Sequence, residues 1–320
     1  MSHTHLSPDK RAVLTLTRAH ELIEALSNPA VVVERQFPHL HQAFLTDTAW
    51  DPQFIFRGVG CSVQHRLVPT ALRPESNKLI CVYDNPGATP NGPRCAVNQK
   101  WAELRLICAF YRHAHRAGLP LPPLCYRLHK ALLDGDESQL TVDTSEEQTF
   151  PIPELFPIFG IAQHYGLPTR LLDWSHSPFV AAFFAAQSAM AMEDKVTAAG
   201  HLAVWLLSAD YLKRTSKSEV HLIEPPTTGN PNLRLQQGVF TLQSYTNGAY
   251  EALDDALRAQ WRGEKIKEGF PLLLKLELPR TEARALMHQL GILGFSANRI
   301  YDGYQGAAES VRLSDLRYQA

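Results

Sequence analysis

The chain has 320 residues, of which 45% are hydrophobic and 20% are charged, and its formal net charge is −1. This composition is that of an ordinary globular protein with a sizeable core, and it excludes a disordered or fibrous chain. The near-neutral charge provides no global basic field that would hold a long nucleic acid by its phosphates, although a local basic groove is compatible with it.

The most apolar stretch is residues 179–192, and it indicates a buried segment rather than a membrane span. It is shorter than the roughly 18 apolar residues that a span requires, and Gln187 and Ser188 interrupt it. The first five residues are polar, unlike the start of a signal peptide. We therefore expect a soluble, cytoplasmic protein without a membrane partner.

The cysteines favour core positions over a disulfide framework, because their number is odd and their spacing irregular. They are Cys61, Cys81, Cys95, Cys108 and Cys125. Cys125 and His129 share a helix face at a spacing that zinc ligands use. A structural metal is nevertheless the weaker interpretation, and we predict none.

In chain order, the first predicted element is a helix over residues 13–26, ended by Asn28 and Pro29. Residues 53–57 alternate as a strand, with Phe56 on one face and Arg57 on the other. Gly58 and Gly60 then indicate a turn.

Two long loops flank a predicted helix at residues 98–117, with Gly118 at its C-terminal cap. The loop at 74–97 is rich in Pro, Gly and Asn, and the loop at 134–153 is acidic. The first loop is long enough to be a functional flap or a disordered excursion, and the second is interpreted as a solvated loop.

The middle of the chain gives the clearest local pattern. A helix from about Pro153 ends at Tyr165-Gly166, and a short strand follows over residues 169–174. Ser175 or Ser177 can cap the next helix, which is apolar on almost every side and is therefore expected to be buried.

The later elements complete a mixed α+β fold with mainly antiparallel sheets flanked by helices. Further strands are expected at 201–207, 238–243 and 271–278, and further helices at 249–260, 281–290 and 304–315. No GxGxxG or GxxxxGK[ST] turn joins a strand to a helix, which disfavours dinucleotide folds of the doubly wound type and P-loops.

Arg57 is the first candidate for chemistry. Its guanidinium can grip a phosphate with two parallel hydrogen bonds, and the adjacent Gly58 permits close approach of a ligand to the backbone. An ion pair with an internal carboxylate such as Asp173 explains the same residue equally well.

A second candidate is residues 163–175, which crowd polar side chains around a turn, a strand and a helix entry. Because such a strand is buried, we expect Arg170 and Asp173 to share a hydrogen-bonded network. That network is either an internal salt bridge or part of a binding site.

These segments resemble the FRG domain family. The resemblance rests on residues 56–58, 68–73, 163–178 and 182–185, with further blocks at 236–241, 290–292 and 300–303. It covers roughly residues 35–310, so we divide the chain into a helical extension (1–34) and an FRG-like domain (35–320) with loop insertions at 74–97 and 134–153.

The order of the blocks is similar to that of ADP-ribosyltransferases, and implies a divergent form of their split sheet. Those enzymes carry an Arg on an early strand, a Ser-Thr-Ser strand leading into a helix, and a strand with a catalytic Glu. The resemblance implies NAD as the substrate, a protein, RNA or DNA acceptor inside the cell, and a toxin or phage-defence role. It implies catalytic roles for Arg57, His164, Tyr165, Asp173, Ser175 and Gln237, and NAD contacts from Arg57, Gly58, Thr169, Arg170 and Ser175.

This sequence departs from that pattern at the catalytic carboxylate, because Gln236 and Gln237 stand where the transferases carry Glu. Asp173, Asp302 or Glu309 must then supply the charge. The alternative is a non-catalytic module that binds a nucleotide or a nucleic acid through arginines such as Arg66, Arg73 and Arg170. A metal-dependent nuclease using His164 and Asp173 is a third hypothesis.

Overall fold

The fold is described here from a computed structural model. The structure describes residues 13–36, 53–63, 67–73, 77–83, 96–140, 150–192, 200–214, 220–225, 230–243, 252–257 and 273–318. Within these ranges, no helix is both long and apolar enough to cross a membrane.

Seven strands of the described residues form one mixed, mostly antiparallel sheet in the order β1-β7-β4-β2-β3-β6-β5. Their bounds are β1 Val13–Thr15, β2 Phe54–Val59, β3 Leu172–Ser175, β4 His201–Ser208, β5 Val220–Ile223, β6 Gly238–Gln243 and β7 Leu273–Pro279. Only β1 and β7 pair in parallel. The predicted α+β class is confirmed.

The sheet divides between β2 and β3. These two strands share the single register pair Phe56–Ser175, whereas β2 pairs with β4 over six residues and β3 pairs with β6 over four. One half therefore consists of β1, β7, β4 and β2, and the other of β3, β6 and β5. The two halves part immediately beyond Phe56 and Ser175.

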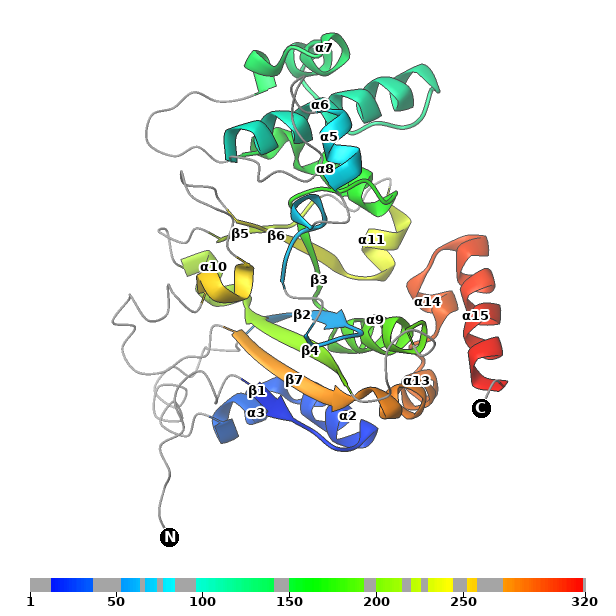
Figure 1. Cartoon of the computed structure of the whole chain (residues 1–320). Coiled ribbons are helices and arrows are strands. Elements are labelled where there is room, and N and C mark those ends of the chain that lie inside the picture. The colour runs from blue at the N-terminus through cyan, green and yellow to red at the C-terminus, as the bar shows by residue number, and fades with distance from the viewer. Residues whose placement is uncertain are drawn as a thin grey trace.

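Each half has its own helical cover (Figure 1). Helices α2 (Ala19–Ser27), α9 (Pro178–Met190) and α13 (Ala283–Ile292) pack on the first half and bury the core that includes Phe56 and Phe183. A helical layer lies over the second half and buries the core around Phe159 and Phe240. That layer comprises α5 (Asn77–Val82), α6 (Ala96–Arg116), α7 (Tyr126–Asp134) and α8 (Phe156–His164).

Smaller elements complete the described chain. The α-helices are α3 (Pro29–Gln36), α10 (Ala209–Arg214), α11 (Pro231–Leu235), α14 (Ala297–Ile300) and α15 (Gly303–Tyr318). The 3₁₀ turns are η2 (Thr70–Leu72), η4 (Glu137–Leu140), η5 (Pro153–Leu155) and η6 (Arg280–Glu282). In Figure 1, α15 runs along the side of the molecule, with α14 beside it.

Capping interactions explain where helices α8 and α9, which flank β3, end and begin. Ser177 is the N-cap of α9, where its Oγ accepts a hydrogen bond from the Val180 amide, and Pro178 occupies the first turn. Helix α8 ends at His164, and Gly166, just beyond its C-cap Tyr165, has a φ of +84° that suits glycine. The predicted elements at residues 153–166 and at α9 are therefore confirmed.

Several boundaries differ from the prediction. Residues 13–15 form a strand rather than the start of a helix, because alternation in this short segment lets it pair with β7. Pro29 begins a second helix, α3, instead of only ending the first. Residues 77–82, predicted as loop, form α5. Gly291 lies inside α13, and Gly294 has the positive φ beyond its end.

Candidate functional site

A cavity of about 690 Å³ lies where the two halves of the sheet part. It collects residues from segments that are far apart in the sequence. The predicted residues that line it are Arg57, Gly58, Gln163, His164, Asp173, Trp174, Ser175 and Gln236. The Arg57 strand and residues 163–175 thus face one space.

The Arg57 side chain closes one side of the sheet split. Its Nη1 donates a hydrogen bond to the main-chain carbonyl of Asp173 at 2.6 Å and lies 3.5 Å from the Asp173 carboxylate. The side chain is 14% exposed, and its Nε is buried with no acceptor in the described part of the chain. Arg57 therefore keeps an unused donor beside the cavity.

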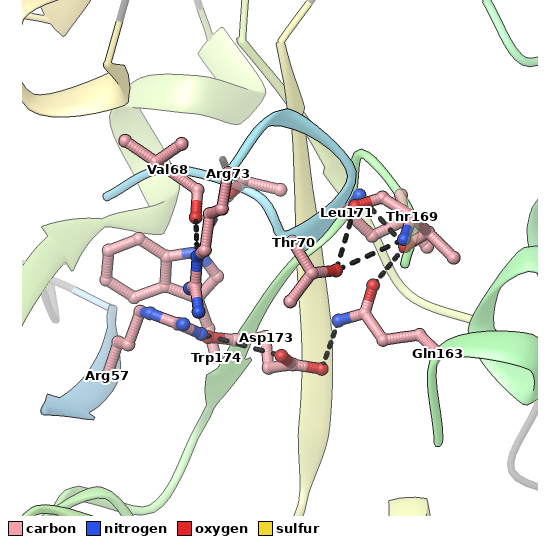
Figure 2. Close-up of polar contacts among 10 residues, drawn as sticks. Arg57, Val68, Thr70, Arg73, Gln163, Thr169, Leu171, Asp173 and Trp174 are labelled. Carbon is pink, nitrogen blue, oxygen red and sulfur yellow. Dashed lines mark hydrogen bonds and ion pairs between the residues drawn. The ribbon is translucent and has the colours of Figure 1, made fainter. Parts of the chain in front are cut away.

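The guanidinium groups of Arg57 and Arg73 lie close together. Arg73 donates from Nε to the Val68 carbonyl at 2.9 Å, and Figure 2 shows its side chain beside that of Arg57. Burial lowers the pKa of Arg57, the positive charge of Arg73 lowers it further, and Asp173 opposes both effects. Arginine stays protonated even so, and an anion bound here would relieve the repulsion between the two cations.

Asp173 belongs to a polar chain that runs back to the start of β3 (Figure 2). Gln163 donates from Nε2 to Asp173 Oδ1 at 2.5 Å, and the Gln163 Oε1 accepts from the Thr169 hydroxyl. The Thr169 Oγ1 in turn accepts from the Leu171 amide at 3.2 Å. The Asp173 side chain is nevertheless 59% exposed, so its carboxylate faces the cavity from a fixed position.

His164 is hydrogen-bonded to Asn232. Asn232 Oδ1 accepts from the Asp302 amide at 2.7 Å, which turns the Asn232 Nδ2 toward His164 Nε2 at 2.8 Å. Since that amide nitrogen only donates, Nε2 accepts and the ring proton is on Nδ1. Burial lowers the pKa of His164, and nearby Asp173 opposes the effect.

Ser175 anchors the backbone rather than offering a free hydroxyl. Its Oγ donates to the Gln236 carbonyl at 2.6 Å and accepts from the Ser177 amide at 2.9 Å. Gln237 has a φ of +48°, its carbonyl accepts from the His176 amide, and its side chain is exposed outside the cavity lining. Ser175 and Gln237 therefore join β3 to β6 at the cavity.

Three residues expected to contact a ligand lie elsewhere. Arg170 is 2% exposed and forms a bidentate ion pair with the buried Glu103 of α6, at 2.7 and 3.1 Å, so its side chain lies against the helical layer. Thr169 is fully buried, and Tyr165 is 75% exposed; neither lines the cavity. Arg170 and Asp173 consequently belong to two separate networks, which corrects the expected shared one.

Gly58 lines the cavity, but the structure gives a packing reason for the glycine. A Cβ at this position would lie 1.8 Å from the Ala181 carbonyl oxygen of α9. Helix α9 therefore approaches β2 so closely that only glycine fits. Packing against α9 therefore requires glycine here in addition to its place in the cavity lining.

Sequence reasoning missed the part of the cavity wall built by α9 and the C-terminal segment. Phe184, Gln187 and Ser188 of α9 line it together with Tyr301 and Gln305. Gln187 and Ser188 are polar residues within an otherwise apolar helix, and that interruption is the signal that could have identified them. Asp302 and Glu309 do not line the cavity, so Asp173 is the carboxylate among the described lining residues.

The cysteine and histidine residues considered as metal ligands have other surroundings. Cys108 is buried in the core under α6, and His129 Nδ1 lies 2.8 Å from the Tyr111 hydroxyl. No group of three or more metal-ligating side chains occurs within the described ranges. Cys95 and Arg66 lie outside the described residues.

Comparison with known proteins identifies the domain that contains the first two blocks. Residues 52–194 match the model of the FRG domain. This range runs from β2 to the end of α9 and includes Arg57 and residues 163–175. Neither the curated proteins nor the solved structures gave a match. The chain therefore contains an FRG domain over residues 52–194.

Proposed function

We propose that this protein is an NAD-dependent ADP-ribosyltransferase-like enzyme that modifies a macromolecule. The observation that carries the proposal is the adjacency of three strands, β2, β3 and β6, around one cavity. They bring together Arg57 of β2, Ser175 of β3 and the Gln236-Gln237 block that precedes β6, in the order in which transferases place Arg, Ser and the third block.

Arg57 supports a phosphate-binding role within this proposal. Its buried Nε has no acceptor in the described part of the chain, and Arg73 adds a second positive charge beside it. The two phosphates of NAD provide acceptors of matching charge. A ligand phosphate in the cavity would offset the repulsion between the two guanidinium groups.

Asp173 supports a cleavage step. When the bond between ribose C1′ and the nicotinamide nitrogen breaks, the electron pair leaves with nicotinamide and C1′ gains oxocarbenium character. A fixed carboxylate at the cavity wall stabilises that positive charge. The acceptor nucleophile then bonds to C1′ and its proton passes to water. Asp173 takes the place of the Glu of the transferases in this scheme.

The test separates binding from cleavage. Purified protein is incubated with labelled NAD alone and with protein lysate, RNA or DNA, and nicotinamide release and label transfer are measured. We expect Arg57→Ala to abolish NAD binding, and Asp173→Asn to retain binding within about threefold while lowering turnover by at least about 100-fold. Arg127→Ala, an exposed arginine that contacts Gln139, is the matched control. Unchanged turnover in Arg57→Ala would refute the assignment.

A second candidate, a non-catalytic module that binds nucleotides, is favoured by the lack of a carboxylate in the third block. Gln236 uses its carbonyl and its amide within the protein, since Nε2 donates to the Ile300 carbonyl at 3.4 Å. The same incubations decide between the two candidates. NAD that binds tightly and stays intact with every acceptor, in folded wild-type protein, would replace the transferase with the binding module.

A further inference from the structure

The FRG-domain cavity contains a glutamine whose amide is held in one orientation from two sides. Gln187 lies on α9 and lines the cavity. The Tyr301 hydroxyl donates to its Oε1 at 2.8 Å, and its Nε2 donates to Glu309 Oε2 at 3.1 Å. The other oxygen of Glu309 accepts from Arg312.

Chemistry determines which way this amide faces. An ionised carboxylate can only accept hydrogen bonds, so the nitrogen of Gln187 must face Glu309 and its oxygen must face Tyr301. Arg312 forms an ion pair with the Glu309 carboxylate. Glu309 and Tyr301 are thus positioning residues for Gln187.

The amide keeps two unused hydrogen-bonding positions after these contacts. Oε1 has a second lone pair, and Nε2 has a second N–H. No further partner of either atom occurs among the described residues. A side chain at a cavity wall with one donor and one acceptor left over is suited to a ligand group with the complementary pair.

The surroundings of Gln187 favour a flat ligand. Phe184 and Tyr301 line the same wall, with ring centroids 6.0 Å apart and planes at 87°. Phe56 and the small residue Ala181 also line the cavity. Aromatic faces and edges stack well against a heteroaromatic ring.

We propose that Gln187 recognises a planar ring that carries a hydrogen-bond donor beside an acceptor. In NAD both ends qualify: the nicotinamide ring bears a carboxamide, and adenine presents an amino group beside a ring nitrogen, an edge that glutamine pairs with in a bidentate manner. This inference rests on the proposed function for its choice of NAD. It concerns recognition and requires no cleavage.

The proposal predicts discrimination between close analogues. Nicotinic acid adenine dinucleotide replaces the carboxamide donor with a carboxylate oxygen, and nicotinamide hypoxanthine dinucleotide replaces the adenine amino group with a carbonyl oxygen. In the analogue that is altered at the recognised end, the new oxygen would face Gln187 Oε1, so that two hydrogen-bond acceptors oppose each other. Since sites built around hydrogen bonds reject such analogues strongly, we expect it to bind the wild-type protein at least about tenfold more weakly than NAD.

The experiment measures dissociation constants for NAD and both analogues by calorimetry. Wild type, Gln187→Met, Tyr301→Phe and the exposed-residue control Gln53→Met are compared. We expect the wild type and the control to bind one analogue more weakly than NAD. In Gln187→Met the ratio of the two dissociation constants should fall below about threefold, and in Tyr301→Phe the ratio should be intermediate. Rejection of the nicotinic acid analogue assigns the nicotinamide end to Gln187, and rejection of the hypoxanthine analogue assigns the adenine end.

Two results would overturn the inference. One is equal binding of NAD and both analogues to wild-type protein, which needs no variant and so does not depend on how Gln187→Met folds. The other is full discrimination in a folded Gln187→Met. Nicotinamide release, measured in parallel, separates the two proposals. Discrimination between the analogues without cleavage supports this inference and refutes the transferase. Cleavage without discrimination supports the transferase and refutes this inference. Absence of binding to any of the three dinucleotides removes both.

Discussion

The Arg57 guanidinium donates to the main-chain carbonyl of Asp173 at the point where β2 and β3 stop pairing. A side chain thus satisfies a carbonyl that loses its strand partner at the split in the sheet. The same side chain leaves its Nε without an acceptor in the described part of the chain. Arg57 therefore links β2 to β3 at the cavity wall.

This contact predicts a stability cost for Arg57→Ala. Leaving the Asp173 carbonyl unsatisfied should lower the free energy of unfolding by about 1–3 kcal/mol, measured by urea titration at 25 °C. A domain with the usual stability of about 5–15 kcal/mol remains folded after that loss, so the variant can be used in binding assays. Arg127→Ala should change the value by less than about 0.5 kcal/mol. Equal midpoints for the two variants would show that the contact contributes nothing.

Gly58→Ala should be strongly destabilising. The new Cβ would lie 1.8 Å from a main-chain oxygen of α9, and backbone on both sides must move to admit it. We expect a loss of about 3 kcal/mol or more in the free energy of unfolding. Gly291→Ala is the matched control, because nothing lies within 4 Å of its Cβ position and the residue is helical. It should stabilise by about 0.5–1 kcal/mol, and a loss there would contradict the packing argument.

Arg170 should behave as a structural residue. Its partner Glu103 is 1% exposed, so Glu103→Ala removes the carboxylate that accepts two hydrogen bonds from a buried arginine. The expected loss is about 3–5 kcal/mol, and replacing both residues with apolar ones should recover much of it. Thermal unfolding of the single and double variants measures this. If Arg170→Met instead weakened NAD binding at unchanged stability, Arg170 would belong to the binding site after all.

His164 predicts a dependence of stability on pH. Because the folded-state pKa lies below the ordinary value of 6.5, the unfolded chain binds the proton more readily in the window just below pH 6.5. The contribution of His164 is complete above pH 6.5 and is lost as the pH falls through its folded pKa. His164→Gln should flatten the fall in melting temperature between pH 7.5 and 5. Parallel curves for the two proteins would refute this account.

The thiols should differ sharply in reactivity. Burial raises the pKa of Cys108 to about 12, so at pH 8 only about one such thiol in ten thousand is ionised. Cys125 is exposed at the start of α7. Iodoacetamide should modify Cys125 in folded protein and reach Cys108 only after unfolding, as read by mass spectrometry of peptides. Labelling of Cys108 in folded Cys125→Ser would show that the α6 core opens.

Local sequence patterns were sufficient to predict strand β3 and the helix α9 that follows it. A serine cap, a proline in the first turn and an apolar run predict a buried helix whatever lies around it, and that helix is observed. The α+β class and the strand that carries Arg57 follow from the same kind of local alternation. That strand, however, continues through Gly58 to Val59, where the sequence predicts a turn. The short segment 13–18 shows the limit, because only its pairing with β7 decides that residues 13–15 form a strand.

The partners of the polar residues were decided by tertiary structure alone. The sequence indicates that Arg57, Arg170 and Gln187 need partners if they are buried, but not which residues these are. Asp173, Glu103 and Glu309 are 116, 67 and 122 positions away from them. Hydrophobic periodicity predicts which side chains are buried, but it does not predict which residues they contact. The partner of a buried charge depends on how the helices and strands pack together. The sequence therefore determined the elements and the block of polar residues, and the packing of α9, the helical layer and the C-terminal segment around the split sheet determined which of those residues form a site.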